Sequence, residues 1–187
     1  MNLNGKTVLF LGSSVTYGSA AGGVSFADMM EENCGIKMIK EAVSGTTLAD
    51  IDDASYVSRL KKVDPSVKID LFICQLSTND ARKVPTLGMV EEAIRFIVEY
   101  VKETFACPIV FYTGTYFESE RYGQMVKLLK DLQKEYGFHI LDLWNAPAMR
   151  AVSAEDYKRY MSDPVHPTLV GYREWWTPQF ITLCESI

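Results

Sequence analysis

The sequence predicts a three-layer α/β/α domain in which helices cover both faces of a five-stranded parallel sheet. The prediction rests on short apolar runs bounded by turn residues, longer segments of helical periodicity between them, and a length of 187 residues that suits one domain. Strands that alternate with helices of this length pair in parallel, because a right-handed crossover returns the chain alongside the previous strand. We therefore expect a single domain over residues 1–187 with the flavodoxin-like strand order 2-1-3-4-5.

The predicted strands are the short apolar runs, each of which suits a strand that is buried on both faces. They span residues 6–11, 36–43, 69–76, 108–113 and 139–144. The predicted helices span residues 25–34, 47–63, 87–105 and 119–136, and a last helix over 168–187 is expected to kink or break at Pro178. The clearest amphipathic stripe lies in 87–105, with Met89, Ala93, Phe96, Ile97, Tyr100 and Val101 as its apolar positions.

The composition is that of an ordinary soluble globular protein, with 48% hydrophobic, 12% aromatic and 23% charged residues. The net charge is −5 and no run of Lys and Arg forms a basic stripe, so nucleic acid is not an expected partner. No apolar stretch approaches the ~18 residues that a membrane span requires. The composition gives no indication of the oligomeric state.

The four cysteines are far apart in the sequence, at positions 34, 74, 107 and 184, and none forms a Cys-x-x-Cys pair. The apolar run at residues 7–11 is too short for the hydrophobic region of a signal peptide, so no export signal is expected. Reduced thiols, no metal site and a cytoplasmic location are therefore the simplest expectations.

Small polar residues follow the first three predicted strands. The segments are Gly12-Ser13-Ser14-Val15-Thr16-Tyr17-Gly18, Ser44-Gly45-Thr46-Thr47 and Ser77-Thr78-Asn79-Asp80. Ligands of open parallel sheets bind beyond the carboxyl ends of the strands, so function is expected at these loops. Any one of the segments, taken alone, is better explained as a turn followed by a helix cap.

The first of these loops does not match either common nucleotide-binding motif. Five residues separate Gly12 from Gly18, and Ser19 stands where a P-loop needs its lysine. A dinucleotide-binding fingerprint fails as well, because Ser14 occupies the position of its second glycine. No cofactor is therefore expected.

One of the two histidines, His166, follows Asp163 by three residues in the segment Asp163-Pro164-Val165-His166-Pro167. This separation lets the carboxylate accept a hydrogen bond from the imidazole, which would fix the tautomer and favour the imidazolium as it forms. His166 is therefore a candidate general base. The other histidine, His139, opens a predicted strand without such a partner and is interpreted as structural.

These segments together resemble the SGNH or GDSL hydrolase family. The resemblance covers nearly the whole chain, in four blocks that occur in order: residues 10–18 resemble the nucleophile block, 43–47 the glycine block, 77–80 the asparagine block, and 163–167 the acid-base block. Three positions depart from the pattern, because Ser13 replaces the Asp of Gly-Asp-Ser, Glu41 replaces a frequent Asn, and Ser77 replaces a frequent Gly. The last two departures put the local turn geometry in doubt.

The resemblance implies a serine esterase with Ser14 as nucleophile, His166 as base and Asp163 as the group that orients the base. In the expected strand order the second and third strands flank the first, so Gly45 and Asn79 should stand on either side of Ser14. The backbone N–H groups of Ser14 and Gly45 and the Asn79 amide are then candidates for an oxyanion hole, as the resemblance also implies.

The substrate expected from the sequence is a small-molecule ester with a short acyl chain, such as an acetyl group on a sugar or another small alcohol. Aromatic residues that follow strands, Tyr17, Tyr116, Phe117 and Trp144, are candidate substrate contacts at the rim, as is Met161. An acyltransferase or a thioesterase could use the same catalytic set. A binding protein that kept the fold without catalysis is the third alternative, although no catalytic residue is missing.

Overall fold

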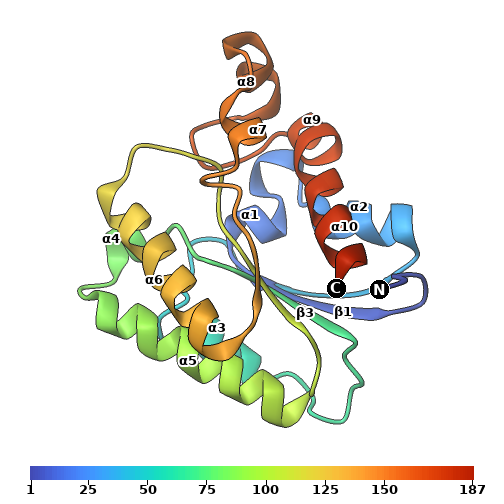
Figure 1. Ribbon diagram of the computed structural model, residues 1–187, viewed down its shortest axis with the longest axis vertical. Coiled ribbons are helices and arrows are strands. Elements are labelled where there is room, and N and C mark those ends of the chain that lie inside the picture. Colours follow the sequence, from blue (N-terminus) through green and yellow to red (C-terminus); the bar gives the residue numbers. More distant parts are fainter.

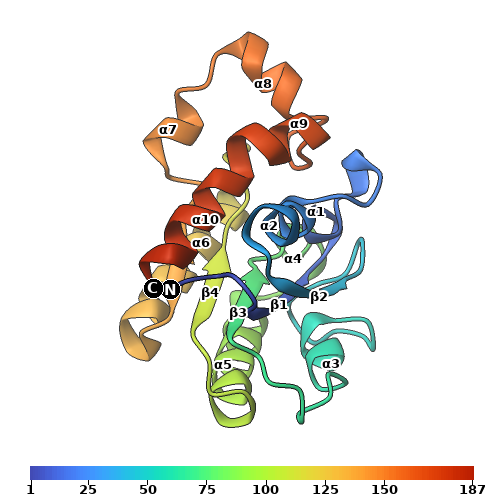
Figure 2. The same cartoon turned by 90° about the vertical axis from the view of Figure 1, so that its right-hand side faces the viewer.

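The computed structural model describes all 187 residues and contains a five-stranded sheet in the order β2-β1-β3-β4-β5 (Figures 1 and 2). The strands are β1 (Thr7–Gly12), β2 (Lys37–Ala42), β3 (Leu71–Gln75), β4 (Ile109–Tyr112) and β5 (His139–Leu141). Every neighbouring pair is parallel. The predicted fold class and strand order are therefore confirmed, and the carboxyl ends of all strands meet at one edge.

Helices cover both faces of this sheet. One face carries α3 (Tyr56–Leu60), α5 (Leu87–Thr104) and α6 (Glu120–Tyr136), and the other carries α2 (Phe26–Cys34) and α10 (Thr177–Ser186) (Figure 1). Shorter elements are α1 (Ser14–Tyr17), a 3₁₀ turn (Ser19–Ala21), α4 (Asp80–Lys83), α7 (Pro147–Arg150), α8 (Ala154–Tyr160), α9 (Leu169–Gly171) and a π-helical turn (Tyr172–Trp176). No helix is sufficiently long and apolar to span a bilayer.

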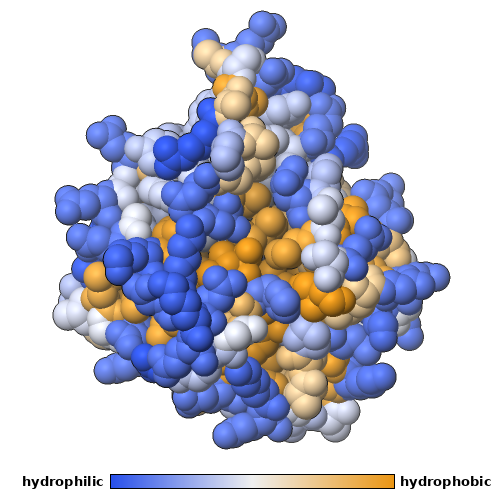
Figure 3. Space-filling model, viewed as in Figure 1, coloured by the Kyte–Doolittle hydropathy of each residue, from blue (hydrophilic) through white to orange (hydrophobic).

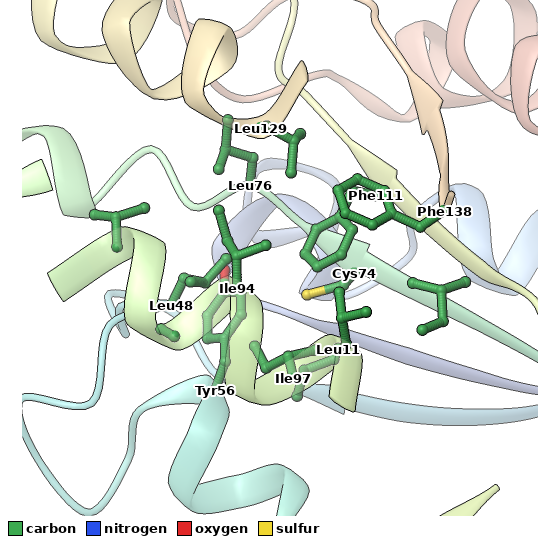
Figure 4. Packing of buried hydrophobic residues seen from close by; sticks show 14 of the residues in the cluster. Leu11, Leu48, Tyr56, Cys74, Leu76, Ile94, Ile97, Phe111, Leu129 and Phe138 are labelled. Carbon is green, nitrogen blue, oxygen red and sulfur yellow. The ribbon is translucent and has the colours of Figure 1, made fainter. Parts of the chain in front are cut away.

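Alternation along the strands divides the core into two layers. In β1, Leu9 and Leu11 face α3, α5 and α6, whereas Val8 and Phe10 face α2 and α10. Figure 4 shows the first layer, in which Leu11 lies beside residues of β3, β4 and α5. On the outside, hydrophilic residues cover most of the face in Figure 3, and hydrophobic residues show between α6 and α10. Side chains of β1 are therefore packed in both layers of the core, and the polar loop of residues 12–18 follows at the carboxyl end of this strand.

The helix predicted over residues 47–63 is wrong in its first half, because only α3 is helical there. The buried carboxylate of Asp80 accepts hydrogen bonds from the backbone N–H groups of Leu48 and Ala49, both at 2.8 Å. These bonds tie the backbone to the start of α4 and replace the bonds of a helix. Ser55 then caps α3 through its side chain, which accepts from the backbone N–H of Ser58.

Two smaller predictions also need correction. The buried stripe of α5 is centred on Val90, Ala93, Ile94, Ile97, Val98 and Val101, so Met89, Phe96 and Tyr100 lie on its flank. The last strand ends at Leu141, because Asp142 turns the chain by accepting from the N–H of Asn145. The four cysteines are free, as expected.

The C-terminal segment breaks near Pro178, as predicted, but the break takes the form of a π-helical turn ahead of the proline. The N–H of Thr177 donates to the carbonyl of Tyr172, five residues earlier, before α10 continues. A proline has no N–H to donate and would crowd the carbonyl four residues before it, so the wider turn accommodates it. Helices α7 and α8 were not predicted.

Phe26 of α2 packs between α10 and the sheet, so its substitution tests the packing of these two helices. Its fully buried ring stacks on Phe180 at a centroid distance of 3.8 Å and meets Tyr112 edge-on at 5.1 Å. Phe26→Ala is expected to lower the free energy of unfolding by about 3–5 kcal/mol, because it leaves a cavity in this cluster. Denaturant unfolding measures the change. The exposed Ile51→Ala is the control, and equal effects of the two substitutions would contradict this packing.

Candidate active site

The turn after β1 places Ser14 at the start of α1, with 9% of its surface exposed. Gly12 ends the strand, and a Cβ atom there would lie 1.7 Å from Oγ1 of Thr16. Only glycine therefore permits this close turn from strand to helix. Because Ser14 is the first residue of a helix, its backbone N–H has no acceptor within the helix and is free to bind an external oxygen.

The side chain of Gln75, the last residue of β3, anchors this turn. Its Oε1 accepts from the N–H of Ser13 at 2.9 Å and from the hydroxyls of Thr16 at 3.0 Å and Tyr56 at 3.3 Å. Since the Thr16 hydroxyl donates to Gln75, the hydroxyl of Tyr112 donates to Thr16 at 2.6 Å. The nucleophile turn is thus tied to the neighbouring strands through buried hydrogen bonds.

The structure brings the three predicted residues of the triad into a continuous chain of hydrogen bonds. Ser14 Oγ lies 2.8 Å from Nε2 of His166, and Nδ1 of His166 lies 2.7 Å from Oδ2 of Asp163. A carboxylate only accepts, so Nδ1 carries the ring hydrogen and Nε2 is left to accept from the serine hydroxyl. The imidazole is therefore in the tautomer that can remove the proton of Ser14.

The loop that carries Asp163 and His166 is closed by its own hydrogen bonds. Oδ1 of Asp163 accepts from the N–H groups of Val165 at 2.7 Å and His166 at 2.9 Å. Partial burial raises the pKa of Asp163, but these bonds and the bond from the His166 ring outweigh it, so the pKa lies below its usual value. Asp163 is therefore ionised at neutral pH and faces the imidazole as an anion.

The glycine block and the asparagine block are joined to each other beside Ser14. Nδ2 of Asn79 donates to the carbonyl of Thr46 at 2.9 Å, and Nζ of Lys83 donates to the carbonyl of Gly45 at 2.6 Å. Gly45 has a φ of +81°, a conformation that favours glycine. The second hydrogen of the Asn79 amide remains for another acceptor. The two turns that the sequence assigned to either side of Ser14 therefore form one connected unit.

Two buried charged residues that support these turns were not recognised in the sequence. The guanidinium of Arg59 donates to the carbonyls of Gly12 at 2.7 Å, Glu41 at 2.6 Å and Ala54 at 3.0 Å, and to Oγ1 of Thr46 at 3.3 Å. Burial lowers the pKa of Arg59 and raises that of Asp80. Arg59 joins the nucleophile turn to the glycine block. Its position in a segment taken for an ordinary helix gave no signal of this role.

The candidate aromatic contacts lie in different environments. Tyr17 and Tyr116 are each 45% exposed, whereas Trp144 is buried between the rings of Tyr116, Phe117 and Tyr122 at centroid distances of 4.9–5.0 Å. Met161 is buried and pairs with Pro167 in an antiparallel bridge. His139 starts β5, so it lies at the amino end of its strand, away from the triad.

A groove of about 450 Å³ lies beside the acid-base loop, between α4 and the segment that follows β4. We call it the polar groove. Its lining residues are Thr78, Ala81, Arg82, Phe117, Glu118, Ser119, Pro164 and Val165. Thr78 directly precedes Asn79, and Val165 directly precedes His166, so the groove borders the triad.

Arg59→Met tests whether the buried guanidinium holds the two turns. The substitution removes the donor to three backbone carbonyls, and it removes the bonds that join the two turns, so the free energy of unfolding should fall by more than about 2 kcal/mol. Arg59→Lys keeps the charge but cannot reach all the acceptors, and should give an intermediate loss. The exposed Arg173→Met is the matched control, and thermal unfolding compares the variants. An Arg59→Met protein as stable as the control would refute this role.

The fold is shared with several solved structures. A protein from Lactobacillus plantarum has a TM-score of 0.82 and 16% identity, with 98% of each chain covered. The SGNH-hydrolase family esterase AlinE4 has a TM-score of 0.66 and 20% identity, covering 98% of this chain and 97% of that one. A family two carbohydrate esterase from Clostridium thermocellum has a TM-score of 0.74 and 12% identity, covering 97% of this chain and 64% of that one.

Comparison of the sequence alone gives the family. No curated protein sequence matches the chain. The model of the GDSL-like lipase/acylhydrolase family matches residues 10–174, which include the nucleophile turn, both neighbouring turns and the acid-base loop. The chain therefore belongs to the GDSL-like lipase/acylhydrolase family, whose members are hydrolases that act on esters.

Proposed function

We propose that this protein is a serine esterase that cleaves a short acyl group from a polar alcohol through an acyl-enzyme on Ser14. The observation that carries the proposal is the chain of hydrogen bonds from Ser14 through His166 to Asp163, at 2.8 and 2.7 Å. A serine hydroxyl becomes a nucleophile when an adjacent base removes its proton, and an oriented imidazole is such a base.

In the acylation step, Oγ of Ser14 attacks the ester carbonyl carbon while its proton passes to Nε2 of His166. The carbonyl oxygen becomes an oxyanion, and the ionised Asp163 stabilises the imidazolium. When the tetrahedral intermediate collapses, the bond between the carbonyl carbon and the alcohol oxygen breaks. His166 then gives its proton to the departing alcohol, and the acyl group remains on Ser14.

In the deacylation step, His166 takes a proton from water, and the resulting hydroxide equivalent attacks the acyl-serine. Collapse of the second tetrahedral intermediate releases the carboxylic acid, and the proton returns to Oγ of Ser14. The donors proposed for both oxyanions are the N–H groups of Ser14 and Gly45 and the amide of Asn79. Their support is the free first-turn N–H of α1 and the bonds that join Asn79 to the glycine block.

The polar groove supports a polar alcohol as the leaving part of the substrate. Four of its eight lining residues carry polar or charged side chains, namely Thr78, Arg82, Glu118 and Ser119. These side chains offer hydrogen bonds to the hydroxyl groups of such an alcohol. Ser14 itself is mostly buried, which favours a small acyl group such as acetyl. The carbohydrate esterase among the similar structures is in keeping with an acetylated sugar.

Ser14→Ala tests the nucleophile. Hydrolysis of p-nitrophenyl acetate should fall by about 10³-fold or more, because removing the nucleophile leaves only the contribution of the oxyanion donors and binding. Labelling by a fluorophosphonate should disappear as well. Ser19 is exposed and lies close to Ser14 in the sequence, so Ser19→Ala is the matched control. It should keep both the hydrolysis of p-nitrophenyl acetate and the fluorophosphonate labelling. Activity and labelling that survive in Ser14→Ala would refute the proposed function.

A series of p-nitrophenyl esters of increasing acyl length tests the acyl preference. We expect the highest kcat/KM for acetate and a steady decline to octanoate, because Ser14 is mostly buried. The leaving group is constant in this series, so the rates report the acyl part alone. Faster cleavage of octanoate than of acetate would contradict a short-chain preference.

A further inference from the structure

Helices α7 and α8 form an arm that projects beyond the carboxyl edge of the sheet (Figures 1 and 2). A pocket of about 540 Å³ lies between this arm and the segment that follows β4, and we call it the arm pocket. Its lining residues are Thr115, Tyr116, Met149, Arg150, Val152, Ala154, Tyr157, Lys158 and Trp175. Nothing in the proposed mechanism uses this pocket.

Thr115 lines the arm pocket and carries a buried hydrogen-bonding group that has no partner. The residue is only 2% exposed, and its Oγ1 has no hydrogen-bond partner in the protein. A buried hydroxyl without a partner costs free energy, so such groups are rare in folded proteins unless a ligand satisfies them. The hydroxyl can donate to an oxygen atom that enters the pocket.

The charge of the arm pocket is positive. Arg150 and Lys158 line it, and none of the lining residues carries a carboxylate. Arg150 is held in place, because its Nε donates to the carbonyl of Trp144 at 3.0 Å and its guanidinium lies 4.0 Å from the ring centroid of Tyr116. The terminal nitrogens of Arg150 and the ammonium of Lys158 are not occupied by any hydrogen bond or ion pair within the protein. In a chain of net charge −5, the lining of this pocket therefore carries a local excess of positive charge.

Both sides of the arm pocket connect to segments of the candidate site. Helix α8 ends at Tyr160, directly before the bridge between Met161 and Pro167 that closes the acid-base loop. On the side opposite the arm, Thr115 follows Gly114, which packs against Thr78. A Cβ atom added at Gly114 would lie 3.7 Å from the methyl group of Thr78. Thr78 in turn precedes Asn79. The segment after β4 thus lies between the arm pocket and the polar groove.

We propose that the arm pocket binds an anionic group on the alcohol part of the ester. The oxyanion would accept from the Thr115 hydroxyl and pair with Arg150 and Lys158, and a ring attached to it would pack on Tyr157 and Trp175. This assignment rests on the proposed esterase function, which it deepens by naming a class of substrate. Carboxylate, phosphate and sulfate esters share the chemistry that the pocket recognises.

Calorimetric titration of the full-length protein tests the pocket without relying on catalysis. The probes are benzoate and phenyl phosphate, with benzamide as the neutral analogue of the same shape. We expect at least one of the anions to bind about tenfold more tightly than benzamide, and the stronger of the two identifies the preferred anion. Equal binding of all three compounds would overturn the proposal.

Two substitutions assign the binding to the arm pocket. Thr115→Val removes only the hydroxyl, so it should weaken anion binding about fivefold while raising the melting temperature, since the unpaired group is gone. Lys158→Met should weaken the binding of the anions to a similar extent and leave the binding of benzamide unchanged. Lys37→Met removes the same charge at the opposite edge of the sheet and should change nothing. Anion binding that persists unchanged in both pocket variants would overturn the assignment.

A kinetic comparison then connects the pocket to the ester. Wild-type protein should hydrolyse 4-acetoxybenzoate with a higher kcat/KM than 4-acetoxybenzamide. Lys158→Met should remove this difference by raising the KM for 4-acetoxybenzoate. Equal values for the two wild-type reactions would overturn the assignment to the alcohol part. Failure of the esterase function itself is recognised separately, because Ser14→Ala would then hydrolyse both acetates as fast as the wild type.

Discussion

The hydrogen bond between Ser14 and His166 is the constraint on which the site depends, because it joins residues that are 152 positions apart in the chain. It requires that the C-terminal segment return to the end of β1. Packing of α10 against α2 brings the segment there, and the hydroxyl of Tyr172 donates to the carbonyl of Val15 at 2.6 Å, within the nucleophile helix. The core on this face of the sheet therefore holds the C-terminal segment in the position that the bond between Ser14 and His166 requires.

Buried polar side chains hold the three turns around Ser14 in place. Gln75 anchors the nucleophile turn, Arg59 connects that turn to the glycine block, and Asp80 fixes the segment that follows the glycine block. Burying such groups is unfavourable unless they form hydrogen bonds, and each of them makes several: Arg59 and Asp80 to backbone groups, and Gln75 to one backbone N–H and to hydroxyls. Their common effect is rigidity. Oxyanion donors are effective when they are held in position before the reaction begins.

The fold and the pairing of Asp163 with His166 could be predicted from the sequence because their signals are local, whereas the role of Ser14 was implied by the family resemblance. Alternating apolar strands and amphipathic helices defined the sheet and its order, and the separation of Asp163 and His166 predicted their hydrogen bond, which the structure contains. Arg59 and Asp80 could not be found in this way, because their partners lie far away in the sequence. The same long-range bonds from Asp80 replaced the helix predicted over residues 47–63. The arm has too short an apolar pattern to be recognised.

The most direct test of the account is to trap the acyl-enzyme. Rapid mixing of the protein with p-nitrophenyl acetate, followed by acid quench and mass spectrometry, should show a protein heavier by one acetyl group, with the modified peptide carrying it on Ser14. The Asp163→Asn protein should form this species far more slowly, since its imidazole is no longer held in the tautomer that accepts from Ser14. Hydrolysis that proceeds without an acetylated Ser14, or with the acetyl group on another residue, would contradict the central claim.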